Sequence, residues 1–359
     1  MAQDLDAHTT PTAGPVDTSL LQRTIITLAA LLLAHACSWI PLPGIEPVAA
    51  ADLFETSGSH LPFQRLSMFM LGLIPMLSAL ILAETAMLVF PELRQLHTGQ
   101  ATRHAVERGI LSVAFVFAAI QAWGMAIAFE DVQGLVTAPG PAFRIMCIAS
   151  MVGATGLLAW LASIITKHGL GSGFWLLLLT PALAGAASLS TGLFAAVQAG
   201  NASAAAMLVP LVFMAAVALA LTALERTNPG AAANAALIWP AILATAAISW
   251  LLVPLLPFLE PQQFDVALQI VAPGQPLRMG LLAVLVPLLT LWRHHSLVNA
   301  AHPRAALKTP LTVGLVLAAI LLSGDALVAW SGLPAVPDAK ALIIAVTVAI
   351  AILQGVRTA

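Results

Sequence analysis

Long apolar stretches, separated by short polar segments, run along almost the whole chain. A helix needs about 20 mostly apolar residues to cross the roughly 30 Å hydrocarbon layer of a bilayer. Ten stretches reach or approach that length, at residues 24–40, 66–90, 109–129, 143–165, 174–198, 203–224, 236–259, 277–292, 310–330 and 339–356. They are too long and too uniformly apolar for the strands of a membrane barrel. The pattern predicts an all-α integral membrane protein with ten transmembrane helices.

The two ends of each predicted helix differ in charge. Of the 14 Lys and Arg residues, ten fall in loops on the side of the N-terminus, and four fall on the other side, namely Arg65, Arg144, Arg278 and Lys340. Cytoplasmic loops are enriched in Lys and Arg, so both termini are predicted to be cytoplasmic. Residues 1–20 are polar and slightly acidic, which predicts a disordered cytoplasmic tail rather than a signal peptide with a basic beginning.

The second and seventh predicted spans share a short motif. Residues 73–79 (LIPMLSA) and 238–244 (IWPAILA) each place a Pro in the span, with an apolar residue two positions later. Each span is the second in a block of five, and blocks with an odd number of spans enter the membrane in opposite senses. This predicts two pseudo-symmetric, inverted five-helix halves, residues 21–200 and 201–359, with the working site between them. Chance similarity of two Pro-containing apolar helices is the alternative.

The composition excludes several classes of protein. Charged residues make up 8% of the chain and hydrophobic residues 60%, and the mean hydropathy of +0.96 is that of a membrane protein, not of a soluble globule. A net charge of −2 and the absence of Tyr argue against a nucleic-acid partner. Two Cys residues, both in apolar runs, give no disulfide framework.

Sequence motifs for nucleotide, protease or hydrolase chemistry are absent, so no enzyme activity and no cofactor are predicted. The glycine-rich residues 169–173 follow no predicted strand, which favours a tight turn over a phosphate-binding loop. His294, His295 and His302 lie beside Arg293 in a predicted cytoplasmic loop. Three imidazoles can hold a metal ion, but a solvated basic loop is the favoured interpretation, and no metal site is predicted.

Glu84 is the most informative charged residue because it lies within the predicted span 66–90. A carboxylate in hydrocarbon is costly unless it faces water or a partner. Two interpretations remain open: an intramembrane polar site that binds a proton or an ion, or a carboxylate reached by interfacial water, since Pro91 marks the nearby end of the span. Asp325, near the outer end of the span 310–330, is the closest comparable group.

Several stretches, in order, resemble motifs of the SecY family, the protein-conducting channel of the general secretory pathway. Residues 40–45 (IPLPGI) are similar to the family's IPIPGI, and residues 65–75 (RLSMFMLGLIP) resemble RxSIFALGIMP. Residues 120–124 (IQAWG) are similar to IQALG, and residues 164–173 (ITKHGLGSG with its preceding Ile) resemble ITERGIGNG. A fainter likeness joins residues 239–242 (WPAI) to the family's IPAI. The resemblance covers about residues 21–357.

The resemblance implies two five-helix halves around an hourglass pore that opens sideways between the second and third spans on one side and the seventh and eighth on the other. A ring of aliphatic side chains would constrict the pore and exclude water by dewetting. Carried onto this chain by position, the ring consists of Leu73, Leu77, Leu178, Ala182, Ile242 and Ile344. Ala182 is small for that role.

Residues 46–64 take the place of the family's plug, a short segment that blocks the resting channel; Leu53, Phe54 and Glu55 lie at its centre. A surface loop is the alternative. The predicted cytoplasmic loops at 225–235 and 293–309 are much shorter than the family's docking loops, which leaves little area for a partner.

The resemblance thus implies a non-catalytic channel subunit of the bacterial inner membrane that translocates or inserts polypeptides. A small SecE-like helical subunit is the expected partner besides lipids and the translocating chain, and docking of SecA or the ribosome is left open. Two other functions remain as alternatives: an ion-coupled small-solute transporter that uses Glu84, and a non-conducting membrane scaffold.

Overall fold

The structure is a computed structural model that describes residues 20–49, 66–90, 92–93, 100–199, 208–252, 269, 271–299, 307–331 and 338–358. The predicted tail lies outside the described residues except for Leu20, which begins the first helix. The plug-like segment also lies outside them from residue 50 onward, including Leu53, Phe54 and Glu55. Both therefore stay predictions.

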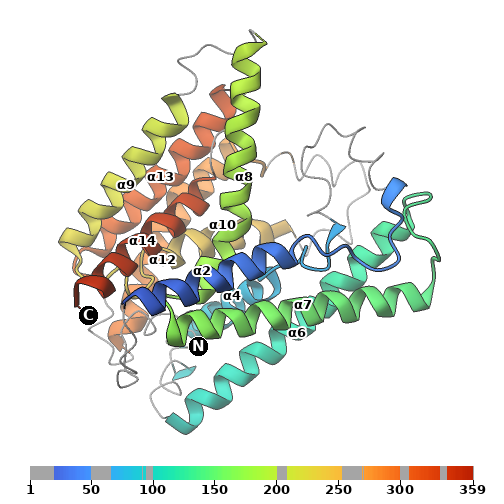
Figure 1. The fold of residues 1–359 in the computed structure, drawn as a ribbon. Coiled ribbons are helices and arrows are strands. Elements are labelled where there is room, and N and C mark those ends of the chain that lie inside the picture. The colour runs from blue at the N-terminus through green and yellow to red at the C-terminus, as the bar shows by residue number, and fades with distance from the viewer. Residues whose placement is uncertain are drawn as a thin grey trace. The chain divides into compact units, whose positions relative to one another are not determined.

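The described chain is built from helices (Figure 1). Their bounds are α2 Leu20–Cys37, α4 Ile74–Val89, α6 Gln100–Glu130, α7 Pro141–His168, α8 Gly173–Gln198, α9 Leu208–Thr227, α10 Trp239–Leu252, α12 Pro276–Asn299, α13 Pro310–Ser331 and α14 Ala339–Thr358. Among the described residues, seven helices are long and apolar enough to cross a membrane: α2, α6, α7, α9, α12, α13 and α14. The prediction of an all-helical membrane protein is confirmed.

Two of the predicted spans begin later than expected. Helix α4 starts at Ile74 rather than at residue 66, and α10 starts at Trp239 rather than at residue 236. Each has a Pro as its second residue, Pro75 and Pro240, where the missing N–H would have no partner within the helix. The two Pro residues therefore lie at helix starts and not in the middle of helices. Non-helical segments, residues 66–73 and 228–238, precede the two helices.

Helix α12 is longer than predicted. It continues past residue 292 to Asn299, so Arg293, His294 and His295 are helical and not part of a solvated loop. Arg293 is buried. His302 lies outside the described residues, and within the part of the chain that is described no three His, Cys, Asp or Glu side chains are grouped so as to hold a metal ion.

The described residues divide into two compact units. The first contains α2, the beginning of α4, α6, α7 and the first turns of α8. The second contains the end of α4, the rest of α8, and α9, α10, α12, α13 and α14. The division falls between Ala83 and Glu84 in α4 and between Thr180 and Pro181 in α8.

In the first unit, α6 packs closely on α7 because one face of α6 carries a row of small side chains. Four of them, Ala114, Ala118, Ala122 and Ala126, recur every fourth residue and are almost fully buried. The Sγ of Cys147 on α7 lies 3.9 Å from the carbonyl oxygen of Ala122. Small residues at this spacing let helix backbones approach closely in a membrane, where packing rather than water drives association.

Replacing Ala118 with leucine is expected to destabilise the first unit. Ala118 has 0% exposure, and overpacking a close-packed interface costs about 1–3 kcal/mol. Val116→Leu is the matched control, because Val116 is 57% exposed and leaves room for a longer side chain. Thermal unfolding in detergent should show a lower midpoint for A118L alone; equal midpoints would contradict the packing described.

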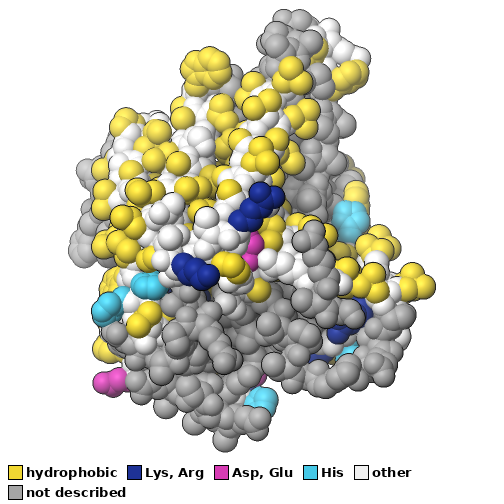
Figure 2. Space-filling view, turned by 90° about the vertical axis from the view of Figure 1, so that its left-hand side faces the viewer, with side chains coloured by type: hydrophobic (Ala, Val, Ile, Leu, Met, Phe, Trp, Pro, Cys, Tyr) yellow, Lys and Arg dark blue, Asp and Glu magenta, His cyan; other side chains and the backbone are white. Residues whose placement is uncertain are grey.

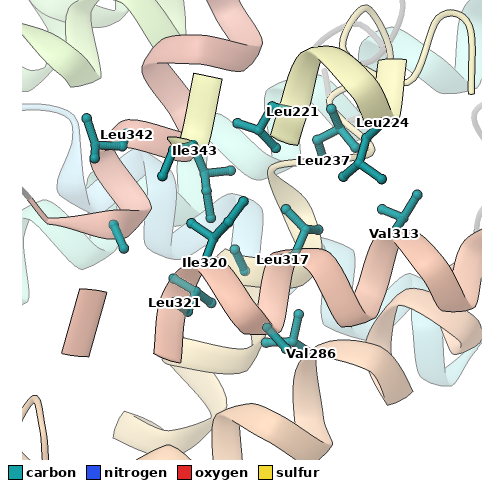
Figure 3. Packing of buried hydrophobic residues seen from close by; sticks show 14 of the residues in the cluster. Leu221, Leu224, Leu237, Val286, Val313, Leu317, Ile320, Leu321, Leu342 and Ile343 are labelled. Atoms are coloured by element: carbon teal, nitrogen blue, oxygen red, sulfur yellow. The ribbon is translucent and has the colours of Figure 1, made fainter. Parts of the chain in front are cut away.

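The second unit has its own apolar core. Side chains from α9, α12, α13 and α14 point toward one another there, among them Leu221, Val286, Leu317 and Ile343, with Leu237 from the segment before α10 (Figure 3). Helices α12 and α13 approach each other closely, since a Cβ on Gly314 would lie 2.7 Å from the Cα of Pro287. The glycine thus sets the spacing of this helix pair.

Large apolar side chains also cover much of the surface of the second unit (Figure 2). On α9 the most exposed are Leu211, Val212 and Leu219. A contiguous apolar surface of this kind is costly in water and is the normal outer face of a helix that lies in lipid.

Candidate functional site

Three of the predicted ring residues lie in the first unit. The backbone N–H of Leu77, in the first turn of α4, donates to the carbonyl oxygen of Leu73, which immediately precedes the helix, at 2.9 Å. Leu73 is buried and Leu77 is half-buried. Leu178, in the second turn of α8, is also half-buried.

The other three predicted ring residues lie in the second unit. Ile242 is in the first turn of α10, and its N–H donates to the carbonyl oxygen of Ile238. Ile242 and Ile344 on α14 are buried, whereas Ala182 on α8 is exposed. The assembly of all six side chains into one ring stays a prediction.

The non-helical segment 66–73, which leads into α4, is held by backbone pairing. Leu42 N–H donates to Leu66 C=O at 2.9 Å, and Met68 N–H donates to Ile40 C=O at 3.2 Å. The N–H of Glu46 donates to the carbonyl oxygen of Leu135 at 2.8 Å, which links this region to the connection between α6 and α7. The IPLPGI motif, which contains a turn at Pro43 and Gly44, is therefore a brace that satisfies backbone groups which would otherwise be buried without partners.

Gly44 is required in this brace for two reasons. Its φ of 84° lies in the left-handed region of backbone conformation, which residues other than Gly rarely adopt. A Cβ there would also lie 3.0 Å from the side chains of Phe143 and Met146 on α7.

The glycine-rich residues 169–173 form a tight turn between α7 and α8, as predicted. Thr166 Oγ1 accepts the N–H of Gly173 at 2.9 Å, which caps the start of α8. Thr27 Oγ1 on α2 accepts the N–H of Leu170 at 2.8 Å, so the turn is also fixed to a third helix.

In the second unit, a buried carboxylate holds the non-helical segment 228–238. Glu225, near the end of α9, accepts the N–H of Gly230 at 2.6 Å with Oε1 and the N–H of Ala232 at 2.7 Å with Oε2. Its Oε1 also accepts a hydrogen bond from Gln354 Nε2 on α14 at 2.8 Å. The carboxylate thus takes the place of backbone partners that a helix would supply.

A second polar contact closes the same region. Asn228 Oδ1 accepts the N–H of Thr309, and Asn228 Nδ2 donates to Thr309 Oγ1, each at 2.9 Å. Residues 225–235, predicted to be a short cytoplasmic loop, are therefore the end of α9 followed by a largely buried segment that packs into the unit. The connection is short, as predicted, and its Ala-rich stretch is buried because its backbone groups have hydrogen-bond partners.

Glu84 has a charged partner in another helix. Arg293 Nε on α12 donates to Glu84 Oε1 at 2.9 Å, and the two side chains are 4% and 1% exposed. One turn further along both helices, the hydroxyl of Ser296 donates to the carbonyl oxygen of Met87 at 3.3 Å. The interpretation that interfacial water solvates Glu84 is therefore wrong. The sequence does not predict this ion pair, because Arg293 follows the last apolar residue of the predicted span 277–292 and is therefore expected in a loop.

Two further acidic side chains, Asp325 and Glu130, also form ion pairs with arginines. Asp325, the second acidic residue found within a predicted span, accepts from Arg278 Nε at 2.7 Å. In the first unit, Arg144 binds Glu130 through Nη2 at 2.6 Å and its guanidinium lies over the ring of Trp123. These pairs account for acidic groups in apolar surroundings without a bound ion.

Comparison with known proteins agrees with this architecture. The SecY family model matches residues 67–229. The protein translocase subunit SecY of Escherichia coli K12 is 31% identical over 182 residues, which cover 46% of this chain and 41% of that protein. The subunit of the same name from Buchnera aphidicola subsp. Baizongia pistaciae is 30% identical, with the same coverage. The match thus spans less than half the length of these relatives.

Two solved structures share the fold over almost the whole chain. One is Sec61 in the canine ribosome-channel complex from the endoplasmic reticulum, and the other is described as the structure of a protein conducting channel. Each has a TM-score of 0.64 and 12% identity, and each comparison covers 96% of this chain and 94% of the other. The match from the segment before α4 to the end of α9 and the shared helical fold thus make this chain similar to SecY-family proteins in sequence and in fold.

Proposed function

We propose that the chain is a non-catalytic, protein-conducting channel subunit that translocates or inserts polypeptides. The observation that carries this proposal is the likeness in fold to protein-conducting channel structures over 96% of the chain. The family match from residue 67 to residue 229 supports it independently, because it rests on sequence and covers the segment that contains Leu73, Leu77 and Leu178.

The proposed architecture is ten membrane helices in two inverted five-helix halves. Helices α4 and α10 support it, because both begin at the residue before a Pro and both follow a buried, non-helical segment. Non-helical backbone at membrane depth is tolerated only where protein or a water-filled cavity surrounds it. The distribution of Lys and Arg supports cytoplasmic termini, and we place the protein in the bacterial inner membrane.

In this proposal the six aliphatic side chains close the pore without binding anything. A ring of Leu, Ile and Ala offers no hydrogen bonds, so a narrow passage lined by it expels water and blocks ions, yet it can widen around a polypeptide of any sequence. Channels of this kind need no cofactor, because the seal depends on side-chain size and polarity alone.

The partners of the proposed channel are lipids, the translocating polypeptide and a small SecE-like helical subunit. The apolar outer surface supports contact with lipid and with a membrane helix. Docking of SecA or the ribosome is not supported in the usual form, because the segment after α9 packs inward and α12 is helical through Asn299, which shortens both places where a long docking loop would project.

An ion-coupled transporter is the alternative function, and the structure gives it little support. Such a transporter would need the Glu84 carboxylate to take up a proton or an ion, whereas the carboxylate already binds the Arg293 guanidinium. A non-conducting scaffold would share the fold but would not leak when the ring is changed.

The test is an ion leak after the ring is made polar. Leu73→Ser and Leu77→Asn, each in the full chain in its native membrane, are expected to raise ion conductance several-fold, because a hydroxyl or amide wets the constriction. The conductance is measured as dissipation of an imposed proton gradient in inverted membrane vesicles at matched protein levels. Two variants are used because the burial of Leu73 could make its substitution affect folding, whereas Leu77 is only half-buried.

Leu82→Ser is the matched control, since Leu82 lies on the same helix and is 45% exposed. Its vesicles should hold the gradient as those of the unmodified chain do. Tight vesicles from both ring variants would contradict the channel and favour the scaffold. A leak in the Leu82→Ser vesicles as large as the leak in the ring variants would also contradict the proposed pore, because Leu82 is not a ring residue.

A further inference from the structure

We propose that the Glu84–Arg293 ion pair is a latch that holds α4 against α12 in the closed channel and separates when the channel opens between these two helices. This inference rests on the proposed function, because a latch requires an opening that it controls. It assigns a role to the most deeply buried ion pair among the described residues.

The contact between the two helices is polar and short. It includes the ion pair at 2.9 Å and the hydrogen bond from Ser296 to Met87 C=O at 3.3 Å, three residues further along each helix. Since the two contacts advance in the same direction along both chains, α4 and α12 run in the same sense there. Helices α4 and α12 correspond to the second and eighth predicted spans, and two even-numbered spans cross the membrane in the same direction. The parallel orientation therefore agrees with the ten-helix topology.

The helices that pack most extensively on α12 are α13 and α10. Between α4 and α12 the described contacts are polar, and the short Ser296 side chain reaches the Met87 backbone, so the two helices lie close together at that point. A contact made by two polar side-chain groups is lost as a unit when the helices part, whereas an interdigitated apolar interface must be unpacked along its length.

The position of the pair links it to the proposed ring. Glu84 follows Leu77 by seven residues, which places it two helical turns away, about 10 Å along α4, on the same face. The face of α4 that carries the ring therefore also carries the latch. An opening that separates α4 from α12 would expose the pair to the same water or polypeptide that occupies the pore.

The physical behaviour of a buried ion pair suits a two-state contact. In an apolar environment the two charges stabilise each other, and removal of one partner leaves the other buried charge without that stabilisation. That remaining charge gains free energy by reaching water, so a single neutralisation favours the open state. Removal of both charges leaves no such preference, and exchange of the two charges restores the attraction.

The experiment measures the proximity of α4 and α12 directly. Cysteines replace Met87 and Ser296 in a chain in which Cys37 and Cys147 have been changed to Ser and Ala, and disulfide formation by a mild oxidant is followed in native membranes. Compared with this parent, Glu84→Gln and Arg293→Gln should each lower the initial cross-linking rate about tenfold or more. The double variant E84Q/R293Q and the exchanged variant E84R/R293E should recover most of the rate.

Arg278→Gln is the matched control, because it leaves Asp325 without its ion-pair partner in the same unit but does not touch α4. Its cross-linking rate should equal that of the parent. Single variants that cross-link at the parent's rate would overturn the latch. So would a double variant as slow as the singles, because that result would show loss of structure rather than release of a charge. If a single variant does not accumulate, the exchanged variant decides: its failure to cross-link overturns the latch.

The outcome is independent of the ring test. Cross-linking reports a contact within the chain and needs no translocation. Leaky ring variants with unchanged cross-linking would leave the proposed function standing and remove the latch. Slow cross-linking in the single variants, together with tight membranes in L73S and L77N, would show a charge-controlled contact in a protein that is not a channel.

Discussion

Alanine at position 173 is expected to prevent α8 from docking on α7 and to abolish accumulation of the folded protein. A Cβ added to Gly173 would overlap the carbonyl oxygen of Ala162 and lie 2.8 Å from the Cβ of Ile165. Both are atoms near the α7 backbone, which cannot move aside as a flexible side chain could. The strain would also disturb the hydrogen bond from Gly173 N–H to Thr166 Oγ1. We expect a loss of about 3 kcal/mol or more in the free energy of unfolding.

The measurement is the yield of monodisperse protein in size-exclusion chromatography of detergent extracts, followed by thermal unfolding of what is recovered. Gly153→Ala is the matched control on α7, because nothing lies within 4 Å of a Cβ added there. That variant should be more stable by about 0.5–1 kcal/mol, since Ala favours a helix over Gly. Normal yield and stability of G173A would mean that the turn can be repacked and that Gly is not required.

Loss of the Glu225 carboxylate is the second change with a large expected effect. In Glu225→Ala the N–H groups of Gly230 and Ala232 and the amide of Gln354 all lose an acceptor. An unsatisfied buried donor costs about 1–3 kcal/mol, so the second unit should lose about 3 kcal/mol or more. Glu225→Gln retains one carbonyl oxygen as an acceptor and should lose less. Thermal unfolding and limited proteolysis after α9 both report the change.

Glu92→Ala serves as the control, because Glu92 is an exposed carboxylate. Its effect should stay within about 0.5 kcal/mol. If E225A were as stable as E92A, the buried backbone of segment 228–238 would have to find other acceptors, and the role assigned to Glu225 would be wrong.

Much of the fold was predictable, because the length and composition of an apolar stretch decide whether a helix can cross a membrane. The stretches that became α2, α6, α7, α9, α12, α13 and α14 are of this kind. Residues 66–73 were assigned to a span for the same reason and are not helical. Hydropathy reports that a segment is buried, but it does not report how the backbone is hydrogen-bonded. Pro75 is the residue in the sequence that indicates where the helix begins, since Pro is common in the first turn of a helix.

The candidate site was only partly predictable. The cost of a carboxylate in lipid marks Glu84 as a residue of interest, but the two interpretations drawn from the sequence are an ion site and solvation by interfacial water, and neither includes an ion pair with another helix. The identity of the partner could not be read, because Arg293 is 209 residues away and only the folded chain brings the two together. Glu225 gave no signal either, since a single acidic residue at the end of an apolar stretch is usually solvated.

The inward packing of segment 228–238 has a practical consequence for work on this protein. Connections between membrane helices are the usual positions for inserting epitopes, protease sites or fluorescent domains. Here an insertion between Asn228 and Leu237 would break the hydrogen bonds to Glu225 and Thr309 and would push Leu237 out of the core of the second unit. The connection between α9 and α10 is therefore a poor site for genetic tagging, although it is short and joins two membrane helices.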